Sequence, residues 1–210
     1  MKPYQTVYIV DDDADMRGSL CRMVRLAGLR AESFASAIEF LGAYRSDHAG
    51  CLLLDVRMPC MSGLELQEHL RRAHIDIPII FLTGYGSVTA AVDAMKLGAL
   101  DFLEKPFDNE VLLDRLKKAL QVDAAARRKR WHHAQTGHRL ARLTAREREV
   151  MEMLASGRNN NAIANLLGVS VRTVETHRSN IMDKMQADSL PDLVRMVLGF
   201  KAHTEDGSVT

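Results

Sequence analysis

Polar residues follow four separate apolar runs of this chain in a pattern that could support phosphoryl chemistry. Asp11 and Asp12 come after the first run, Asp55 ends the next, and Thr83 and Lys105 end or follow two later ones. An aspartate can act as a nucleophile and hold an acyl phosphate. Because phosphoryl groups and carboxylates repel, such a site needs a hard divalent cation with oxygen ligands.

Each of these residue types has a distinct task in that chemistry. We expect Asp55 to be the nucleophile, Asp12 and Asp55 to bind Mg²⁺, and Asp11 to support the site through metal-bound water. Thr83 can donate a hydrogen bond to the phosphoryl oxygens, and Lys105 can neutralise part of their charge.

Two alternatives use the same residues differently. An acidic turn can simply cap the next helix, because carboxylates favour its positive N-terminal end, and we assign that role to Asp13 and Asp15. Aspartyl-phosphate hydrolases that depend on Mg²⁺ place a second Asp two residues after the nucleophile. Arg57 occupies that position here, which argues against a hydrolase.

These residues need a scaffold that gathers the ends of several strands. Between 6 and 107, strand-like apolar runs alternate with amphipathic segments, which is typical of βαβ units in a doubly wound parallel sheet. Ligands bind beyond the carboxyl ends of such strands. We predict five strands, at 7–10, 31–34, 51–54, 79–83 and 101–104, and helices that include 16–27, 64–73, 88–97 and 111–120.

Charge divides the chain into two modules. Residues 1–124 contain 14 Lys/Arg and 18 Asp/Glu, whereas residues 125–210 contain 14 and 9. A basic second module favours a nucleic-acid partner. The 3 cysteines form neither a disulfide set nor a metal-ligand spacing, and no apolar run is long enough to cross a membrane. We therefore expect a cytoplasmic protein without a membrane partner.

The second module is predicted to be an all-α, four-helix domain that contains a helix-turn-helix. Thr144 and Glu147 form a capping-box pattern, Gly168 closes a short second helix, and Ser170 caps a third. A fourth helix is predicted at 190–198. The outward side chains of the third helix suit phosphates and base edges, and the expected DNA contacts there are Arg172, Thr173, Glu175, Thr176, Arg178 and Ser179.

The first module resembles a bacterial response-regulator receiver domain. Residues 4–122 carry "VDDD", "LLDVRMPCMSG", "FLTGYG" and "FLEKPF" in the order typical of that family. The resemblance implies a CheY-like five-stranded fold and transfer of a phosphoryl group from a sensor histidine kinase to Asp55. It also implies that the backbone carbonyl of Arg57 completes the Mg²⁺ shell.

The same resemblance implies a conformational switch. The hydroxyl of Thr83 is coupled to Phe102, which turns inward when the phosphoryl group recruits that hydroxyl, and the Lys105–Pro106 peptide bond is cis. Phe102 could alternatively be an ordinary core residue. The family pairs its receivers through the fourth helix and fifth strand, and the residues that we expect on this surface are Val92, Met95, Lys96 and Asp101.

The segment "LTAREREV…IANLLGVSVRTVETHRSNIMDKM" resembles a LuxR-type DNA-binding domain, so that the whole chain is similar to the FixJ/NarL family and nearest to its FixJ branch. The resemblance implies binding to two-fold promoter DNA as a homodimer, with RNA polymerase as a further partner. Asn160 is a candidate DNA contact. Asn161 stands where the family commonly has a lysine, which predicts weaker non-specific binding.

The expected organisation is a receiver at 1–122, a helical basic linker at 123–142, the DNA-binding domain at 143–201 and a disordered tail at 202–210. We interpret the charge run at 127–130 as a solvated helix face, and binding of nucleic acid by "RRKRWHH" is the alternative. The expected function is phosphorylation-switched transcriptional regulation without enzymatic turnover, apart from slow self-dephosphorylation. A receiver that is never phosphorylated, or a regulator of protein partners instead of DNA, are the alternatives.

Overall fold

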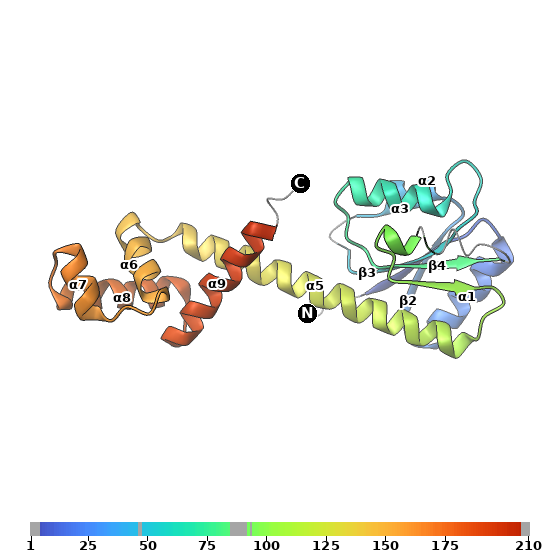
Figure 1. Cartoon of the computed structure of the whole chain (residues 1–210). Coiled ribbons are helices and arrows are strands. Elements are labelled where there is room, and N and C mark those ends of the chain that lie inside the picture. The colour runs from blue at the N-terminus through green and yellow to red at the C-terminus, as the bar shows by residue number, and fades with distance from the viewer. Residues whose placement is uncertain (1–4, 46–47, 85–91, 93, 207–210) are drawn as a thin grey trace. The chain divides into compact units, whose positions relative to one another are not determined.

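The computed structural model describes residues 5–45, 48–84, 92 and 94–206 (Figure 1). The chain forms two compact units, with the boundary between Arg127 and Arg128. Helix α5 (Asn109–Ala141) contributes residues to both units. Among the described residues, no helix is long and apolar enough to cross a membrane.

The first unit is built on a parallel sheet of five strands in the order β2-β1-β3-β4-β5. This confirms the predicted doubly wound sheet, and every strand begins and ends within one residue of its predicted bounds. The strands are β1 (Thr6–Val10), β2 (Arg30–Phe34), β3 (Gly50–Asp55), β4 (Ile79–Thr83) and β5 (Asp101–Glu104).

Helices cover both faces of this sheet (Figure 1). One apolar core joins it to α1 (Ala14–Leu26) and α5, and the other joins it to α2 (Ala37–Ala43) and α3 (Gly63–Arg72). All five residues of β1 are buried, as expected for a parallel strand covered on both faces. The helix that we predicted at 88–97 lies partly outside the described residues.

Local sequence signals fix where the helices next to the strand ends begin. The Asp13 side chain accepts hydrogen bonds from the backbone of Asp15 and Met16, at 2.9 and 3.1 Å, which confirms its capping role at α1. Gly63 begins α3 against the backbone of Asp55. A Cβ atom on Gly63 would lie 2.2 Å from the Asp55 carbonyl oxygen, so only glycine fits there.

The second unit contains α6 (Ala145–Ala155), α7 (Asn160–Leu167), α8 (Val171–Met185) and α9 (Leu190–Asp206). Gly168 closes α7 in the left-handed conformation, with φ 63°, and the Ser170 side chain caps α8. This confirms the predicted helix-turn-helix. The four helices share a core that includes Val150, Ile163, Val174, Ile181 and Leu193.

Two segments are more helical than expected. Helix α5 continues to Ala141, so the segment near 137–142 is helical almost to its end. Helix α9 continues to Asp206, and the prediction of disorder is therefore wrong for 202–206, whereas 207–210 lie outside the described residues. Residues 202–206 include Ala202 and Glu205, which are strong helix formers, and Lys201 precedes them.

Candidate functional site

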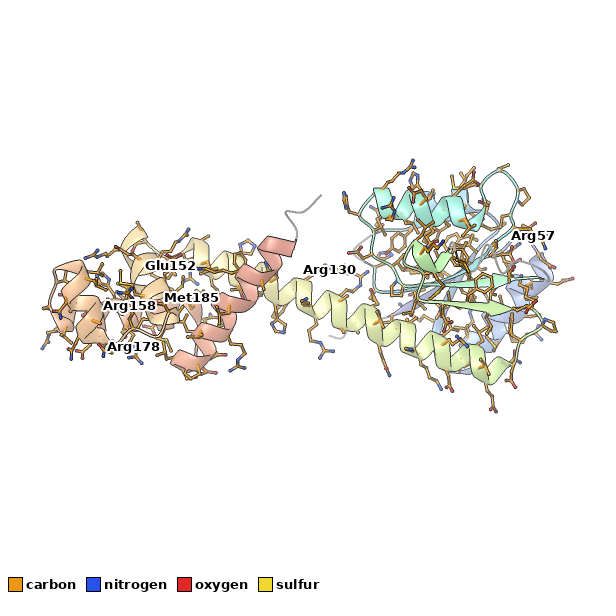
Figure 2. The ribbon with its side chains drawn as sticks, viewed as in Figure 1. Arg57, Arg130, Glu152, Arg158, Arg178 and Met185 are labelled. Carbon is orange, nitrogen blue, oxygen red and sulfur yellow. The ribbon has the colours of Figure 1, made fainter. Side chains whose placement is uncertain are left out.

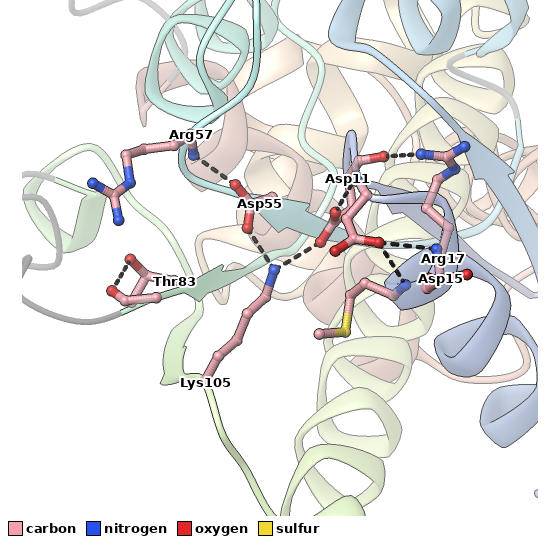
Figure 3. Close-up of polar contacts among 10 residues, drawn as sticks. Asp11, Asp15, Arg17, Asp55, Arg57, Thr83 and Lys105 are labelled. Carbon is pink, nitrogen blue, oxygen red and sulfur yellow. Dashed lines mark hydrogen bonds and ion pairs between the residues drawn. The ribbon is translucent and has the colours of Figure 1, made fainter.

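The residues of the first unit that we expect to take part in phosphoryl chemistry lie at one edge of the sheet (Figure 3). Asp11 follows β1, Asp55 ends β3, Thr83 ends β4 and Lys105 follows β5. These are the carboxyl ends of parallel strands, and the strand order reverses between β1 and β3. Ligands bind at such a reversal in open α/β sheets.

Lys105 bridges the two carboxylates that lie deepest in this site. Its Nζ atom is 2.8 Å from Asp11 Oδ2 and 2.7 Å from Asp55 Oδ1. The side chains of Asp11 and Asp55 are only 2% and 11% exposed. The ammonium group therefore offsets part of the repulsion between these two carboxylates in a poorly solvated place.

Burial and pairing act in opposite directions on these charges. Burial raises the pKa of Asp55, and the hydrogen bond from Lys105 offsets this only in part. Burial is the largest single influence on Lys105 and works against its charged form, but the hydrogen bonds and charge attraction to Asp11 and Asp55 together outweigh it, so the pKa of Lys105 is raised. Lys105 thus stays protonated and available to an anion at the site.

Backbone and arginine donors hold further oxygen atoms of Asp55 and Asp11 in place. The Arg57 backbone N–H donates to Asp55 Oδ2 at 2.7 Å, and the Asp13 backbone N–H donates to Asp11 Oδ1 at 2.9 Å. Arg17 Nη1 donates to the Asp11 carbonyl oxygen at 2.7 Å. Sequence reasoning missed Arg17, although a cation in the first turns of the helix after an acidic strand end is a usable signal.

Thr83 and Phe102 lie on the neighbouring strands β4 and β5 but contact different groups. The buried Thr83 hydroxyl donates to the Gly84 carbonyl oxygen at 3.0 Å. Phe102 is half-buried against the core, with its ring centroid 6.5 Å from that of Phe81. The Lys105–Pro106 peptide bond is cis, as expected. The coupling of Thr83 to Phe102 remains a prediction.

The atoms that could bind a metal at this site are mainly oxygens. Asp12, the predicted ligand next to Asp11, is exposed. Within the described parts of the chain, no three His, Cys, Asp or Glu side chains are close enough together to hold a metal. A cation would therefore take several ligands from water or backbone carbonyls. Mg²⁺ commonly binds in that way, through one or two carboxylates.

The predicted receiver-pairing surface is described only in part. Val92 and Met95 are 45% and 48% exposed, and Lys96 is exposed as well. Asp101 forms an ion pair with Arg115. Exposed apolar side chains next to charged ones are compatible with a contact surface, and pairing through it stays a prediction.

In the second unit, α8 presents one apolar and one polar side. Val174, Ile181 and Met185 are buried. Arg178, labelled on α8 in Figure 2, is partly exposed. The other predicted contacts range from partly to fully exposed, namely Arg172, Thr173, Glu175, Thr176 and Ser179.

Several of these polar groups also bond within the unit. Thr173 Oγ1 lies 2.8 Å from Ser170 Oγ, and Thr176 Oγ1 donates to the Arg172 carbonyl oxygen at 3.0 Å. Asn160 is partly exposed at the start of α7, and Asn161 is exposed. The charged side chains of α8 are therefore the most available to a DNA groove. Thr173 and Thr176 would first have to give up these hydrogen bonds.

A buried ion pair connects α6 to α8. Lys184 Nζ is 2.7 Å from Glu147 Oε2, and Glu147 also completes a capping box with Thr144. The sequence indicated only the capping role. The ion pair was missed because Lys184 is 37 residues away along the chain. The ion pair fixes α8, which presents the polar side, against α6.

Comparisons with known proteins agree with both halves of this geometry. Residues 7–117 match the family described as response regulator receiver domain, and residues 141–197 match the bacterial regulatory proteins of the luxR family. The transcriptional regulatory protein FixJ of Azorhizobium caulinodans is 45% identical over 192 residues, which cover 91% of each chain.

Two further relatives extend this likeness. Nodulation protein W of Bradyrhizobium diazoefficiens is 43% identical over 206 residues, covering 97% of this chain and 91% of that protein. The solved structure of the response regulator StyR is similar with a TM-score of 0.84 and 43% identity, covering 92% of this chain and 98% of the other. Both families of domain are thus matched in one continuous chain.

Proposed function

This chain belongs to the FixJ/NarL family of two-component transcriptional response regulators, and from that premise we propose that a phosphoryl group on Asp55 controls its binding to DNA. The observation that carries the proposal is the bridge from Lys105 to Asp11 and Asp55 at the strand ends. It combines a fixed acceptor carboxylate with a permanent cation beside it.

The transfer requires one bond to form and one to break. A carboxylate oxygen of Asp55 attacks the phosphorus of a phosphohistidine on a sensor kinase, and the P–N bond breaks as the P–O bond forms. The freed imidazole nitrogen takes up a proton. Lys105 is within hydrogen-bond distance of the acceptor carboxylate and can donate to the incoming phosphoryl oxygens. No turnover of a further substrate is involved, and slow hydrolysis of the acyl phosphate resets the protein.

The donor atoms at the site fit Mg²⁺ as the cation. Asp12 and Asp55 would bind it, with the Arg57 carbonyl as a third ligand and Asp11 holding metal-bound water. When bound, Mg²⁺ supplies positive charge that offsets repulsion between the phosphoryl group and the carboxylates. Arg57 meanwhile orients Asp55 through its backbone N–H.

The proposed switch runs from Asp55 to the receiver surface. The Thr83 hydroxyl exchanges the Gly84 carbonyl for a phosphoryl oxygen, which lets Phe102 move further into the core. The surface near Val92 and Met95 then pairs two receivers. Pairing places two copies of α8 on a two-fold promoter site, where RNA polymerase is a further partner. A cytoplasmic location fits these partners.

The test is intact mass and oligomeric state after Mg²⁺ and a small phosphodonor are added to the full chain. Wild type should gain one phosphoryl group and shift towards a dimer, whereas Asp55→Asn should do neither. No adduct on wild type would make the receiver an unphosphorylated interaction domain, which was the alternative left open. An adduct without dimerisation would retain Asp55 as the acceptor and remove receiver pairing from the mechanism.

A further inference from the structure

The second half of α5 is a strongly basic segment that belongs to the same compact unit as α8. Residues 124–141 contain 5 Lys/Arg and 3 His but no Asp or Glu, and Arg142 follows directly. Arg127 pairs with Asp123, and Arg139 donates to the Met185 carbonyl oxygen. These contacts account for part of the charge, and the side chains of Arg128, Lys129 and Arg142 are exposed.

The opposite side of this helix packs into the unit. The His133 ring stacks on that of Phe200, with centroids 4.4 Å apart, and Thr136 is buried. Leu140 packs against the core, and a Cβ on Gly137 would lie 3.1 Å from the Phe200 ring. Spacing of three and four residues places this set on one face of the helix.

Helical geometry then collects an exposed set on the other face. At about 100° per residue, four residues of α5 lie within a sector of about 80° opposite the packed face, and a fifth residue, Arg142, follows in the turn after Ala141. We call this set the basic stripe, and it consists of Arg128, Trp131, Gln135, His138 and Arg142. Trp131 is 57% exposed, and Arg128, His138 and Arg142 are exposed.

The cations of the basic stripe are available to an outside anion. Within the part of the chain that the structure describes, the side chains of Arg128 and Arg142 form no ion pair. Lys129 and Arg130, the latter labelled in Figure 2, follow Arg128 in the chain and add positive charge around the helix. The exposed indole of Trp131 adds a flat surface and an N–H donor to this positive field.

We propose that the basic stripe is a second DNA-contacting surface, which binds phosphates of duplex DNA outside the bases reached by α8. The inference rests on the proposed DNA binding by α8. Two observations favour DNA over an acidic protein. The stripe shares a compact unit with the helix-turn-helix, and it offers exposed cations and hydrogen-bond donors to an anion. Contacts of this type carry no sequence information and act through phosphate neutralisation.

The salt dependence of binding tests this surface quantitatively. The full chain would be titrated against a labelled duplex of arbitrary sequence, about 40 base pairs long, at several salt concentrations. Arg128→Gln with Arg142→Gln removes two cations from the stripe. Lys117→Gln with Lys118→Gln, on the first part of the same helix, removes two exposed cations elsewhere and serves as the matched control.

The stripe variant should have a salt slope shallower by about 1.8, because each lost phosphate contact changes the slope by about 0.9. Its affinity deficit relative to wild type should therefore shrink roughly tenfold between about 50 and about 200 mM salt. The control should retain the wild-type slope. Unchanged thermal unfolding of both variants would show that folding is intact.

Fluorescence of Trp131 provides an independent measurement, because the chain contains a single tryptophan. Saturating duplex should protect its fluorescence from quenching by acrylamide. Absence of duplex binding by wild type would refute DNA binding itself. Wild-type binding with an unchanged slope in the stripe variant and an unprotected Trp131 would overturn only this inference. Intact DNA binding by the stripe variant, combined with loss of transcription by purified polymerase, would also overturn the inference. That result would assign the stripe to a protein partner.

Discussion

At the scale of single residues, Lys105 determines the electrostatics of the proposed phosphoacceptor site. It lies between two buried carboxylates, and each carboxylate has a further backbone donor. Asp55 therefore has both oxygens fixed before any phosphodonor arrives. A preoriented nucleophile loses less entropy in reaching the transition state, which is the physical value of this arrangement.

Another buried carboxylate has a purely structural role. Asp123 is fully buried on α5, accepts from the Gly50 backbone N–H at 2.9 Å and pairs with Arg127. Asp123→Asn should lower the free energy of unfolding of the receiver by about 2–3 kcal/mol, because Arg127 loses its counter-charge in a buried place. Urea unfolding of the full chain followed by circular dichroism measures this change.

Asp114→Asn is the matched control for that experiment. Asp114 lies on the same helix, but its side chain is 82% exposed and its cation, Lys117, is 3.7 Å away. The expected loss is about 0.5 kcal/mol or less. Equal losses in the two variants would show that the Asp123 pair adds nothing beyond an exposed ion pair.

At the scale of elements, α5 is the helix whose role differs most from expectation. It was predicted to become a linker after the receiver, yet its second half packs in the DNA-binding unit through His133, Thr136 and Leu140. Its counterpart is the C-terminal part of α9, which carries Phe200. The DNA-binding unit therefore has a fifth helical segment in its fold.

Phe200→Ala tests that contact. Loss of a half-buried ring and of its stack on His133 should lower the stability of the second unit by about 1–2 kcal/mol. Leu198→Ala, on the same helix but 55% exposed, should change it by about 0.5 kcal/mol or less. Thermal unfolding of both full-length variants gives the comparison, and similar shifts would contradict a packing role for Phe200.

The contact between α6 and α8 predicts a dependence of stability on pH. Hydrogen bonds from Lys184 and then from the Thr144 backbone hold the pKa of Glu147 below its ordinary value of 4.5. The unfolded chain therefore binds the proton at higher pH than the folded chain does. The stabilisation is complete above the unfolded pKa and is lost as pH falls through the folded pKa.

Glu147→Gln should accordingly lower the stability of the second unit by about 1 kcal/mol at neutral pH, and the deficit should shrink below pH 4.5. Urea unfolding across that pH range measures it. Glu149→Gln on the same helix is the control, because Glu149 is 48% exposed beside Arg146. A deficit that does not depend on pH would exclude the ion pair as its cause.

At the scale of the whole molecule, the chain joins a receiver domain to a LuxR-type DNA-binding domain, each with its own core. If phosphorylation acts by pairing receivers, DNA affinity should rise 5- to 150-fold, which is the usual range of coupling between sites. On a DNA sequence selected with the phosphorylated chain, phosphorylation should also make the binding curve steeper with respect to protein concentration. Fluorescence anisotropy with and without phosphodonor measures both effects.

DNA geometry provides the control for that prediction. Insertion of about five base pairs between the half-sites rotates one of them by about half a helical turn and should remove the gain in affinity. Asp55→Asn should show no gain on either DNA. A gain that survives the insertion would indicate activation of single copies instead of paired ones.

The sequence alone determined the strand ends, and with them which residues lie at the candidate site. Asp55, Thr83 and Lys105 were recognisable because each stands at or directly after the end of a strand-like run, and the carboxyl ends of parallel strands share one edge of the sheet. The helix-turn-helix was equally accessible, since caps and glycines such as Ser170 and Gly168 are local signals. Periodicity and capping depend only on neighbours in the chain.

Only the tertiary structure decided which distant charges meet. The sequence suggested that Lys105 serves a phosphate, but not that it bridges Asp11 and Asp55. It also gave no sign that Glu147 meets Lys184 or that Asp123 reaches Gly50. Such pairs join segments tens of residues apart, and their partners are selected by how the helices pack. The basic stripe is of the same kind, because a run of cations becomes a surface only once packing has assigned the opposite face of α5.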